Sequence, residues 1–168
     1  VGCQKPSRGT SEFIRVDASK VVLSHVRVID GTGGPAREDQ NITLSQGVIA
    51  SIEQAPQGFA AGQNVLDLHG RSVIPGLVGM HDHLFYPTDS GRYHEMAFSF
   101  PRLYLALGVT TIRTVGSVQP ESDAQIKKEI DAGQTLGPRI HLSGPYLGGQ
   151  ALHNLGAQRM VQRVNYWL

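Results

Sequence analysis

Two histidines at the end of a short apolar segment carry the clearest chemical signal in this sequence. His81 and His83 follow the apolar run 77–80, with Asp82 between them. Side chains two residues apart on a β-strand point to the same side, so both imidazoles would face one point while Asp82 points away and could orient its neighbours. Neutral imidazole is a good ligand for zinc and related divalent ions. The spacing therefore indicates a metal site, with a purely structural histidine pair as the alternative.

The segments around these histidines predict strands that alternate with helices. Strands are expected at 77–80, 109–115 and 139–142, and helices at 95–107, 120–132 and 157–167. The strand at 77–80 is so apolar that burial on both of its faces is expected. Pro101 requires the first helix to be broken or to begin late, and Gly108 is suited to end it. This order predicts an α/β fold with parallel strands, whose carboxyl ends form the active-site face in a closed barrel.

Residues 20–74 predict a different kind of structure, a series of short antiparallel strands with no convincing helix. The first strand begins at Lys20 and places Val22, Val26 and Val28 on one face. Further strands are expected at 41–44, 48–53, 65–68 and 72–74, with tight turns at 46–47 and 69–71 and a loop at 56–63. The glycines at 31–34 join antiparallel strands and open no helix, so they do not form a phosphate-binding loop.

Composition excludes several classes of protein. The chain has 168 residues with 15 basic and 14 acidic side chains, so it offers no basic stripe for nucleic acid. A single cysteine cannot form an internal disulfide, and the longest apolar stretches fall far short of the roughly 20 residues that span a bilayer. Hydrophobic residues make up 40% of the chain, which argues against wholesale disorder.

Residues 1–19 are interpreted as a leader or linker. A small residue before Cys3 resembles the end of a bacterial lipoprotein signal, in which the cysteine becomes the lipidated first residue. On that interpretation the protein belongs to the bacterial cell envelope or periplasm, and otherwise to the cytoplasm. The alternative for Cys3 is a free thiol in a loosely held terminus.

Several motifs resemble the N-terminal part of the amidohydrolase superfamily of metal-dependent hydrolases. The most specific is Pro-Gly-Leu-x-x-x-His-x-His at 75–83, preceded by Val-Ile-Asp-Gly-Thr-Gly at 28–33, Gln-Gly-Val-Ile-Ala-Ser-Ile at 46–52 and Val-Leu-Asp-Leu-His-Gly-Arg at 65–71. Residues 107–116 resemble the second barrel strand of the family, and 137–140 the approach to the third. Among branches, the chain is most similar to imidazolonepropionase-like and dipeptidase-like enzymes.

This resemblance implies a fold, a cofactor and a reaction. The expected fold is a partial (β/α)8 TIM barrel of about three βα units at 75–168, preceded by part of a small β-sandwich domain at 20–74. One or two divalent metals, most often zinc, would be held in the complete site, with His81 and His83 as the first-strand ligands. Water activated by the metal would hydrolyse the C–N bond of a small-molecule amide, cyclic amide or dipeptide.

The chain departs from the family because the ligands of later strands have no counterpart in it. A lysine, two further histidines and an aspartate are expected on strands that this sequence does not contain. No catalytic residue and no substrate-binding residue is therefore assigned, and this chain alone is expected to be inactive. One alternative is a truncated, non-catalytic family member that acts as an interaction module and needs a partner chain, either the remainder of the same enzyme or a second copy. Another is a two-histidine metal-binding protein without hydrolytic activity.

Other side chains have both a functional and a plain interpretation. His69 is expected on the surface or in the sandwich, and His94 either edges the site or begins a helix in solvent. Arg113 could reach a substrate carboxylate or form an ion pair inside the barrel. The remaining candidates are His141, as a core or functional histidine, His153, in a loop where it cannot be placed, and Tyr86, at a pocket mouth or merely packed.

Overall fold

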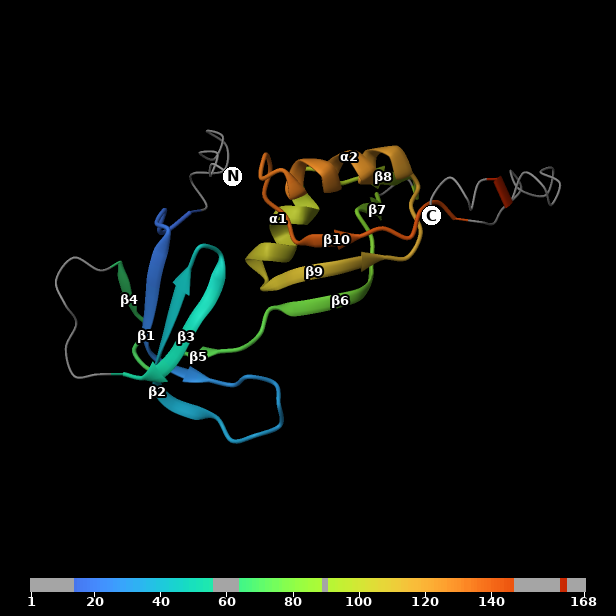
Figure 1. Cartoon of the computed structure of the whole chain (residues 1–168). Helices are drawn as coiled ribbons and strands as arrows, with labels where there is room; N and C mark the ends of the chain where they lie inside the picture. The colour runs from blue at the N-terminus through green and yellow to red at the C-terminus, as the bar shows by residue number, and fades with distance from the viewer. Residues whose placement is uncertain (1–13, 56–63, 89–90, 147–160, 163–168) are drawn as a thin grey trace. The chain divides into compact units, whose positions relative to one another are not determined.

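The computed structural model describes residues 14–55, 64–88, 91–146 and 161–162, and these residues form two compact units (Figure 1). The first unit ends at Pro75 and is called the sheet unit. The second begins at Gly76 and is called the α/β unit. The assignment of these units as part of a sandwich and part of a barrel stays a prediction.

Three antiparallel strands make up most of the sheet unit. They are β1 (Lys20–Val28), β2 (Arg37–Ser45) and β3 (Val48–Gln54), in the order β3-β2-β1. Gln46 and Gly47 connect β2 to β3 with φ angles of 50° and 79°, as a two-residue hairpin of the type I′ class requires. Val22, Val26 and Val28 are buried, which confirms the predicted alternation along β1. The core of this unit is formed by Val26, Val28 and Ile42, with Leu23, Leu44, Ile52, Leu68 and Val73 packed against them.

The prediction that all of these strands are antiparallel is wrong for the last two. The short strands β4 (Val65–Asp67) and β5 (Ser72–Val73) both run parallel to β1 along its other edge. The φ angles of His69 and Gly70, 49° and 76°, are close to those of the hairpin turn at 46–47, so they do not set the direction of the chain. The Gly70 N–H donates a 2.6 Å hydrogen bond to the His25 carbonyl, which holds the turn against β1. The chain therefore steps along β1 and continues in the same direction.

Three parallel strands and two helices form the α/β unit. The strands β6 (Leu77–Asp82), β9 (Val109–Thr114) and β10 (Arg139–His141) are arranged as β10-β9-β6, and their arrows point the same way in Figure 1. The connections carry α1 (Ser99–Ala106) and α2 (Pro120–Asp131). The predicted order of parallel strands and helices is confirmed over this stretch. Of the helix predicted at 157–167, only 161–162 are described, and they are helical.

The helix boundaries follow the local sequence. Pro101 is the third residue of α1, where a missing N–H costs nothing, so the helix begins late as predicted. Gly108 follows the end of α1 with a φ of 80°, the left-handed conformation of a residue just beyond a helix. In α2, Pro120 occupies the first turn with Glu121 and Asp123, whose charges favour a helix N-terminus.

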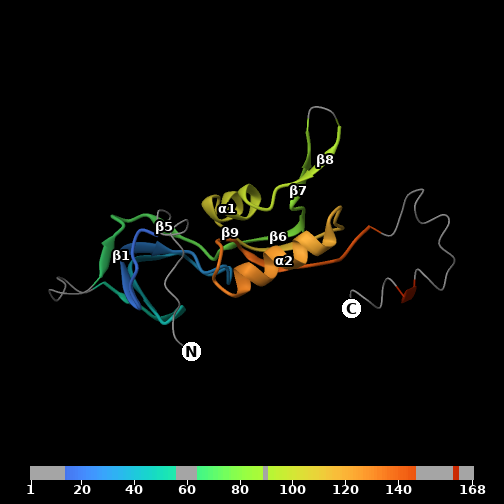
Figure 2. The same cartoon turned by 90° about the horizontal axis from the view of Figure 1, so that it is seen from above.

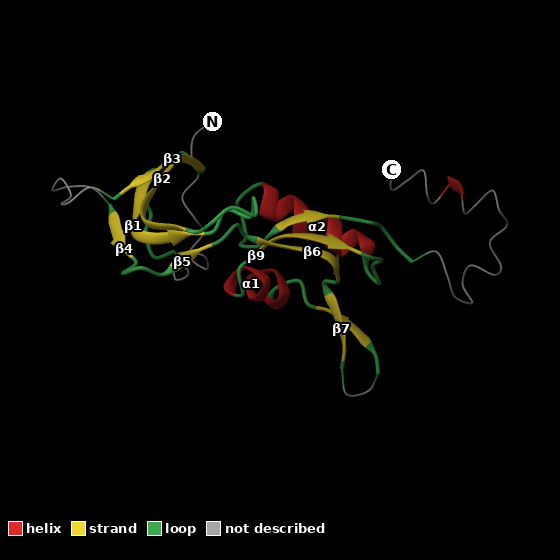
Figure 3. Ribbon diagram, turned by 90° about the horizontal axis from the view of Figure 1, so that it is seen from below, coloured by secondary structure: helices red, strands yellow, loops and turns green. Residues whose placement is uncertain are grey.

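A β-hairpin replaces the first part of the helix predicted at 95–107. Strand β7 (Phe85–Pro87) pairs antiparallel with β8 (Tyr93–Glu95), and the hairpin extends away from the three-stranded sheet (Figures 2 and 3). The Met96 N–H donates a 2.6 Å hydrogen bond to the Leu84 carbonyl, which closes the hairpin at its base. Long-range pairing of Phe85 with Glu95 has overridden the helical preference of the segment around Glu95.

The hydrophobic cluster of the α/β unit joins its sheet to both helices. Leu84, Ile112, Ile126 and Ile140 are buried there, with Ala97, Phe100, Tyr104, Val109, Ile130 and Leu142 packed around them. The predicted burial of β6 on both faces is wrong for the described chain, since Leu77, Val78 and Met80 are 49%, 60% and 63% exposed. None of these three side chains belongs to the hydrophobic cluster of the unit, and β6 is also an edge strand, with β9 on one side only.

The helices in the described part of the chain include none with the length and apolar character needed to cross a bilayer.

Candidate active site

The carboxyl ends of three parallel strands lie at one edge of the α/β sheet, and the predicted metal ligands are found there. His81 lies near the end of β6, and His83 follows the strand directly. Their ring centroids are 5.6 Å apart, and the ring planes are nearly perpendicular at 88°. The side chain of His81 is exposed and that of His83 is half-buried. The two imidazoles are therefore neighbours, as their spacing predicts, and their role as ligands stays a prediction.

The main chain around His83 is held by its neighbours. The Tyr104 hydroxyl on α1 donates a 2.9 Å hydrogen bond to the His83 carbonyl, and the Val115 N–H donates one of 3.2 Å to the Asp82 carbonyl. The carboxylate of Asp82 leans over Gly79, where any Cβ would overlap it. Burial and this carboxylate together raise the pKa of Tyr104. Asp82 is thus packed against its own strand, beside the backbone that carries the histidines.

Imidazole nitrogens are suitable ligands for a divalent metal ion, so the side chains of His81 and His83 could bind one. Nδ1 of His83 is buried and has no hydrogen-bond partner among the described residues. No group of three or more His, Cys, Asp or Glu side chains in the described ranges is arranged to hold a metal ion. Because catalytic zinc sites normally use three protein ligands, His81 and His83 would supply only part of such a set.

A pair of buried carboxyl groups lies in the same unit. Burial, together with the negative charge of Asp123, raises the pKa of Glu95 to about 8. Burial also raises the pKa of Asp123, while hydrogen bonds from Ser117 and Glu95 oppose this shift. When both groups are ionised, the oxygens of Glu95 and Oδ1 of Asp123 have no hydrogen-bond donor among the described residues, and a proton on Glu95 joins the two groups in one hydrogen bond. Two such groups cannot both ionise at low cost, so at neutral pH this pair retains a proton.

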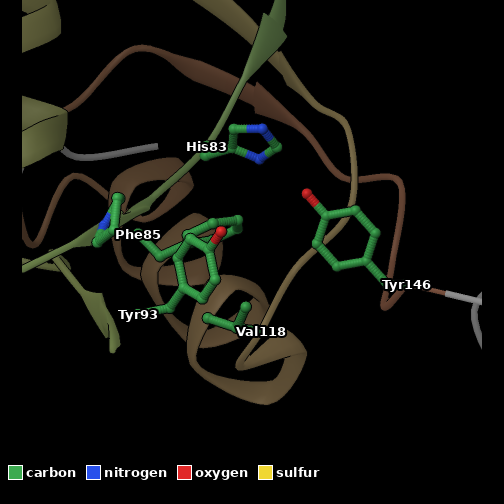
Figure 4. Close-up of a pocket in the computed structure, with 6 residues that line it drawn as sticks. His83, Phe85, Tyr93, Val118 and Tyr146 are labelled. Atoms are coloured by element: carbon green, nitrogen blue, oxygen red, sulfur yellow. The ribbon is translucent and has the colours of Figure 1, made fainter. Parts of the chain in front are cut away.

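A pocket of about 420 Å3 opens beside His83 (Figure 4). Its lining is largely aromatic and comes from the hairpin and from the loops that follow β9 and β10. The lining residues are His83, Phe85, Pro87, Tyr93, Val118 and Tyr146. The volume lies within the range of roughly 300–1,000 Å3 that is usual for small-molecule sites.

The other candidates from the sequence lie apart from this pocket. His69 belongs to the sheet unit, with its side chain 84% exposed and Nδ1 3.4 Å from Asp67. His94 lies on β8 and not at the start of a helix, because residues 93–95 form the second strand of the hairpin. Tyr86 is 59% exposed, and its ring packs 6.2 Å from Phe100 rather than at the pocket.

Two candidates share the exposed face of β9 and β10. His141 pairs in register with Arg113, and both side chains are exposed, so His141 is not the core histidine that the sequence favoured. The described residues include no ion-pair partner for Arg113, and its reach toward a substrate stays a prediction. Cys3, His153 and Trp167 lie outside the described residues.

Sequence reasoning missed the aromatic lining and the buried carboxyl pair. Phe85 and Tyr93 begin the two strands of the hairpin, which was not predicted, and Tyr146 lies in the loop after β10. Glu95 and Asp123 are 28 positions apart in the sequence. Asp123 lies in the first turn of α2, where acidic residues are common, so its position gave no sign of another role. Nothing local in the sequence indicated that these two carboxyl groups meet.

Comparison with known proteins identifies relatives that are much longer. No family model matches the chain. A dihydroorotase from Syntrophus aciditrophicus (strain SB) is 33% identical over 107 residues, which cover 62% of this chain and 24% of that enzyme. A dihydroorotase from Caldanaerobacter subterraneus subsp. tengcongensis is 29% identical over 110 residues, with 66% and 24% coverage. The chain thus spans about a quarter of the length of the curated relatives that it matches.

Solved structures give a consistent result. A crystal structure of a Xaa-Pro dipeptidase with bound methionine matches 82% of this chain and 37% of its own, with a TM-score of 0.65 and 23% identity. L-Hydantoinase (dihydropyrimidinase) from Arthrobacter aurescens matches 73% of this chain and 27% of its own, with a TM-score of 0.52 and 26% identity. These likenesses support the mixed α/β fold.

Proposed function

Because this chain belongs to the amidohydrolase superfamily, we propose that it forms the part of a metal-dependent hydrolase that supplies His81 and His83 as the first metal ligands. The reaction is hydrolysis of a C–N bond in a small-molecule amide, cyclic amide or dipeptide. The relatives are amidohydrolases that act on C–N bonds, and this supports the reaction class.

The observation that carries this proposal is the arrangement of the two imidazoles. His81 and His83 lie side by side at the carboxyl end of β6, and Nδ1 of His83 is buried without a hydrogen-bond partner among the described residues. A buried polar atom without a partner is costly, and it is retained where a ligand satisfies it. A divalent cation, with zinc the usual ion of the family, has the donor preference that this pair meets.

The residues of this chain position the ligands. A bound divalent metal would supply Lewis acidity and would lower the pKa of bound water from 15.7 toward roughly 7. The Tyr104 hydroxyl fixes the His83 carbonyl and so holds the segment that carries both imidazoles. The Asp82 carboxylate lies over Gly79, at a position that a Cβ on residue 79 would occupy.

We further propose that the α/β unit forms the first barrel units of a (β/α)8 barrel, and that residues 20–74 form part of a small β-sandwich. The exposed apolar side chains Leu77, Val78 and Met80 on the edge strand β6 support this proposal, because a closed barrel would cover them. The remaining metal ligands would then come from later barrel strands. On this proposal the 168-residue chain alone is inactive.

Metal retention provides the test. The 168-residue chain, its His81→Ala and His83→Ala variants and a His94→Ala control are dialysed against micromolar zinc, and zinc per chain is measured by mass spectrometry. We expect weak but measurable retention by the wild-type chain, about tenfold less in either ligand variant, and no change in the control, because His94 is exposed on β8. Equal zinc retention by all four proteins would contradict the assignment of His81 and His83.

A longer form that carries the later strands separates the two main hypotheses. We expect it to hold one or two ions per chain tightly and to hydrolyse C–N bonds, with both properties lost in His81→Ala and His83→Ala. The second hypothesis, a non-catalytic interaction module, is favoured by the exposed edge of β6 alone. It predicts instead that the 168-residue chain associates with a partner or with itself, and that no longer form shows turnover.

A further inference from the structure

The pocket beside His83 is built around one buried phenylalanine. Phe85 is only 7% exposed, and its ring centroid lies 4.6 Å from that of His83. The Tyr93 ring meets Phe85 edge-on at 5.3 Å, and the Tyr146 ring lies 6.3 Å away in a similar arrangement. These separations lie within the range in which aromatic rings attract one another beyond simple burial. Tyr93 and Tyr146 themselves remain 59% and 49% exposed, so their rings are available to a ligand.

Tyr146 occupies its position because residue 116 is a glycine. Gly116 follows β9 with a φ of 90°, a conformation that residues with a Cβ rarely adopt. A Cβ at this position would also overlap the Tyr146 ring. The Gly116 N–H donates a 2.7 Å hydrogen bond to the Ser143 hydroxyl, which ties the loop after β9 to the loop that carries Tyr146. The wall of the pocket opposite Tyr93 is therefore fixed by local backbone geometry (Figure 4).

The chemistry of the lining restricts what the pocket can hold. None of the six lining residues is an Asp, Glu, Lys or Arg. A charged group placed there would lose its water without gaining an ion-pair partner. The polar side-chain atoms of the lining are limited to the hydroxyls of Tyr93 and Tyr146 and the imidazole of His83, and the rest of the lining offers aromatic and apolar contact. An uncharged, flat and apolar group satisfies all of these conditions.

We propose that this pocket receives an uncharged aromatic ring of the substrate, adjacent to the C–N bond that is cleaved. This inference rests on the proposed function, because it places the ring next to the histidines that would hold the metal. Phe85 and Tyr93, from the hairpin, and Tyr146, from the loop after β10, are then the specificity-determining residues. Their rings select an aromatic over an aliphatic substituent through ring–ring contact.

The test uses the metal-free 168-residue chain in EDTA, so that it does not depend on metal binding or turnover. Benzamide is the probe, with acetamide as the match that lacks a ring and benzoate as the match that carries a charge. Binding is followed by NMR of the aromatic protons of the protein. We expect benzamide to bind in the millimolar range, at least tenfold more tightly than acetamide or benzoate.

Variants locate the binding site. We expect Tyr93→Ala and Tyr146→Ala each to weaken benzamide binding about fivefold to tenfold, and Gly116→Ala to do the same by displacing Tyr146. Tyr86→Ala is the matched control, because Tyr86 is an equally exposed tyrosine on the same hairpin that does not line the pocket. Tyr93→Phe and Tyr146→Phe keep the rings and should retain binding within about twofold, which provides a test even where an alanine variant fails to fold.

Equal binding of benzamide and acetamide would overturn the proposal, and so would an equal loss in Tyr86→Ala and Tyr93→Ala. Tighter binding of benzoate would show an anion site instead. Selective benzamide binding together with absence of metal retention would leave the pocket standing and refute the metal assignment. Metal retention that depends on His81 and His83, without selective benzamide binding, would refute the proposed ring pocket and leave the metal assignment standing.

Discussion

The two units of this protein differ in their buried polar groups, although both have ion pairs at the surface. In the sheet unit, charged side chains are paired at the surface, as in the 2.8 Å contact of Arg27 with Glu38 and the 2.7 Å contact of His25 with Asp39. In the α/β unit, several polar atoms are buried without a hydrogen-bond partner among the described residues. They belong to Asp82, His83, Glu95, Arg102 and Asp123, and no residue of the sheet unit is among them.

This difference supports the proposal that the functional site lies in the α/β unit. Exposed ion pairs contribute little to stability and place few demands on their surroundings. Buried groups without partners are expensive, and proteins tolerate them mainly where binding or catalysis uses them. The α/β unit, which contains the buried polar atoms without partners, is also the unit that contains His81, His83 and the pocket.

The largest expected effect tests whether the two units have separate cores. Ile112→Ala removes a fully buried side chain from the α/β unit, and Ile42→Ala removes one that is 3% exposed from the sheet unit. Each should lower the free energy of unfolding by about 2–5 kcal/mol, because each leaves a cavity. Hydrogen exchange followed by mass spectrometry should show the loss of protection mainly in the unit that carries the substitution. Loss of protection across both units in either variant would contradict separate cores, and Val48→Ala, at a site 63% exposed, serves as control.

A smaller effect tests the close packing beside the histidines. In Gly79→Ala the new Cβ would overlap the Asp82 carboxylate, so we expect a loss of about 1–3 kcal/mol in urea unfolding. Gly34→Ala in the sheet unit is the matched change, because its nearest neighbour, Oγ1 of Thr32, would lie at an ordinary distance of 3.5 Å. That variant should be as stable as the wild type. Equal losses in the two variants would show that the crowding is not specific to the α/β unit.

A pH-dependent effect tests the buried carboxyl pair. Glu95 has an ordinary pKa of 4.5, which would apply in the unfolded chain, and a folded pKa of about 8. The folded state therefore holds a proton that the unfolded state has released, so stability should fall as the pH rises from 4.5 to 8 and level off above that. Glu95→Gln should reduce this fall, leaving only the part that Asp123 contributes, and should be about 1–2 kcal/mol more stable than the wild type at pH 8, allowing for the partial exposure of the residue.

Chemical denaturation at several pH values measures the effect of Glu95→Gln. Glu38→Gln is the control, because Glu38 forms an exposed pair with Arg27 in the sheet unit. Its stability should follow that of the wild type at every pH. A wild-type stability that stays flat between pH 4.5 and 8 would show that Glu95 is already ionised in the folded protein.

The smallest expected effect concerns an exposed pair of the sheet unit. The hydrogen bond from His25 to Asp39 raises the pKa of His25 above its ordinary value of 6.5, and the stability from this pair is present below pH 6.5 and lost as the pH rises through the folded pKa. In Asp39→Asn the NMR titration of His25 should return toward 6.5, while unfolding midpoints barely change. Asparagine tolerates the φ of 52° at this position, so the backbone is preserved. An unchanged His25 titration would show that Asp39 is not the cause.

Local patterns were sufficient for much of the framework. The apolar alternation of β1, the turn at Gln46 and Gly47, and the late start of α1 at Pro101 each depend on neighbouring residues, and each was predicted. The hairpin β7–β8 was not predicted, because the pairing of Phe85 with Glu95 outweighs a weak helical preference. The direction of β4 and β5 was predicted wrongly, because a turn with glycine at its second position suits both a reversal and a step along β1.

The sequence by itself determined that His81 and His83 lie together at a strand end, because the two-residue period of a strand brings their rings to the same side. It also determined the order of parallel strands and helices, since apolar periodicity and helix-ending glycines are local signals. Only the tertiary structure decided that Glu95 meets Asp123 and that Phe85, Tyr93 and Tyr146 enclose a pocket beside His83. Those contacts join residues from different elements. Strand register and hairpin pairing bring these residues together, and the short-range spacing of residues does not encode either of them.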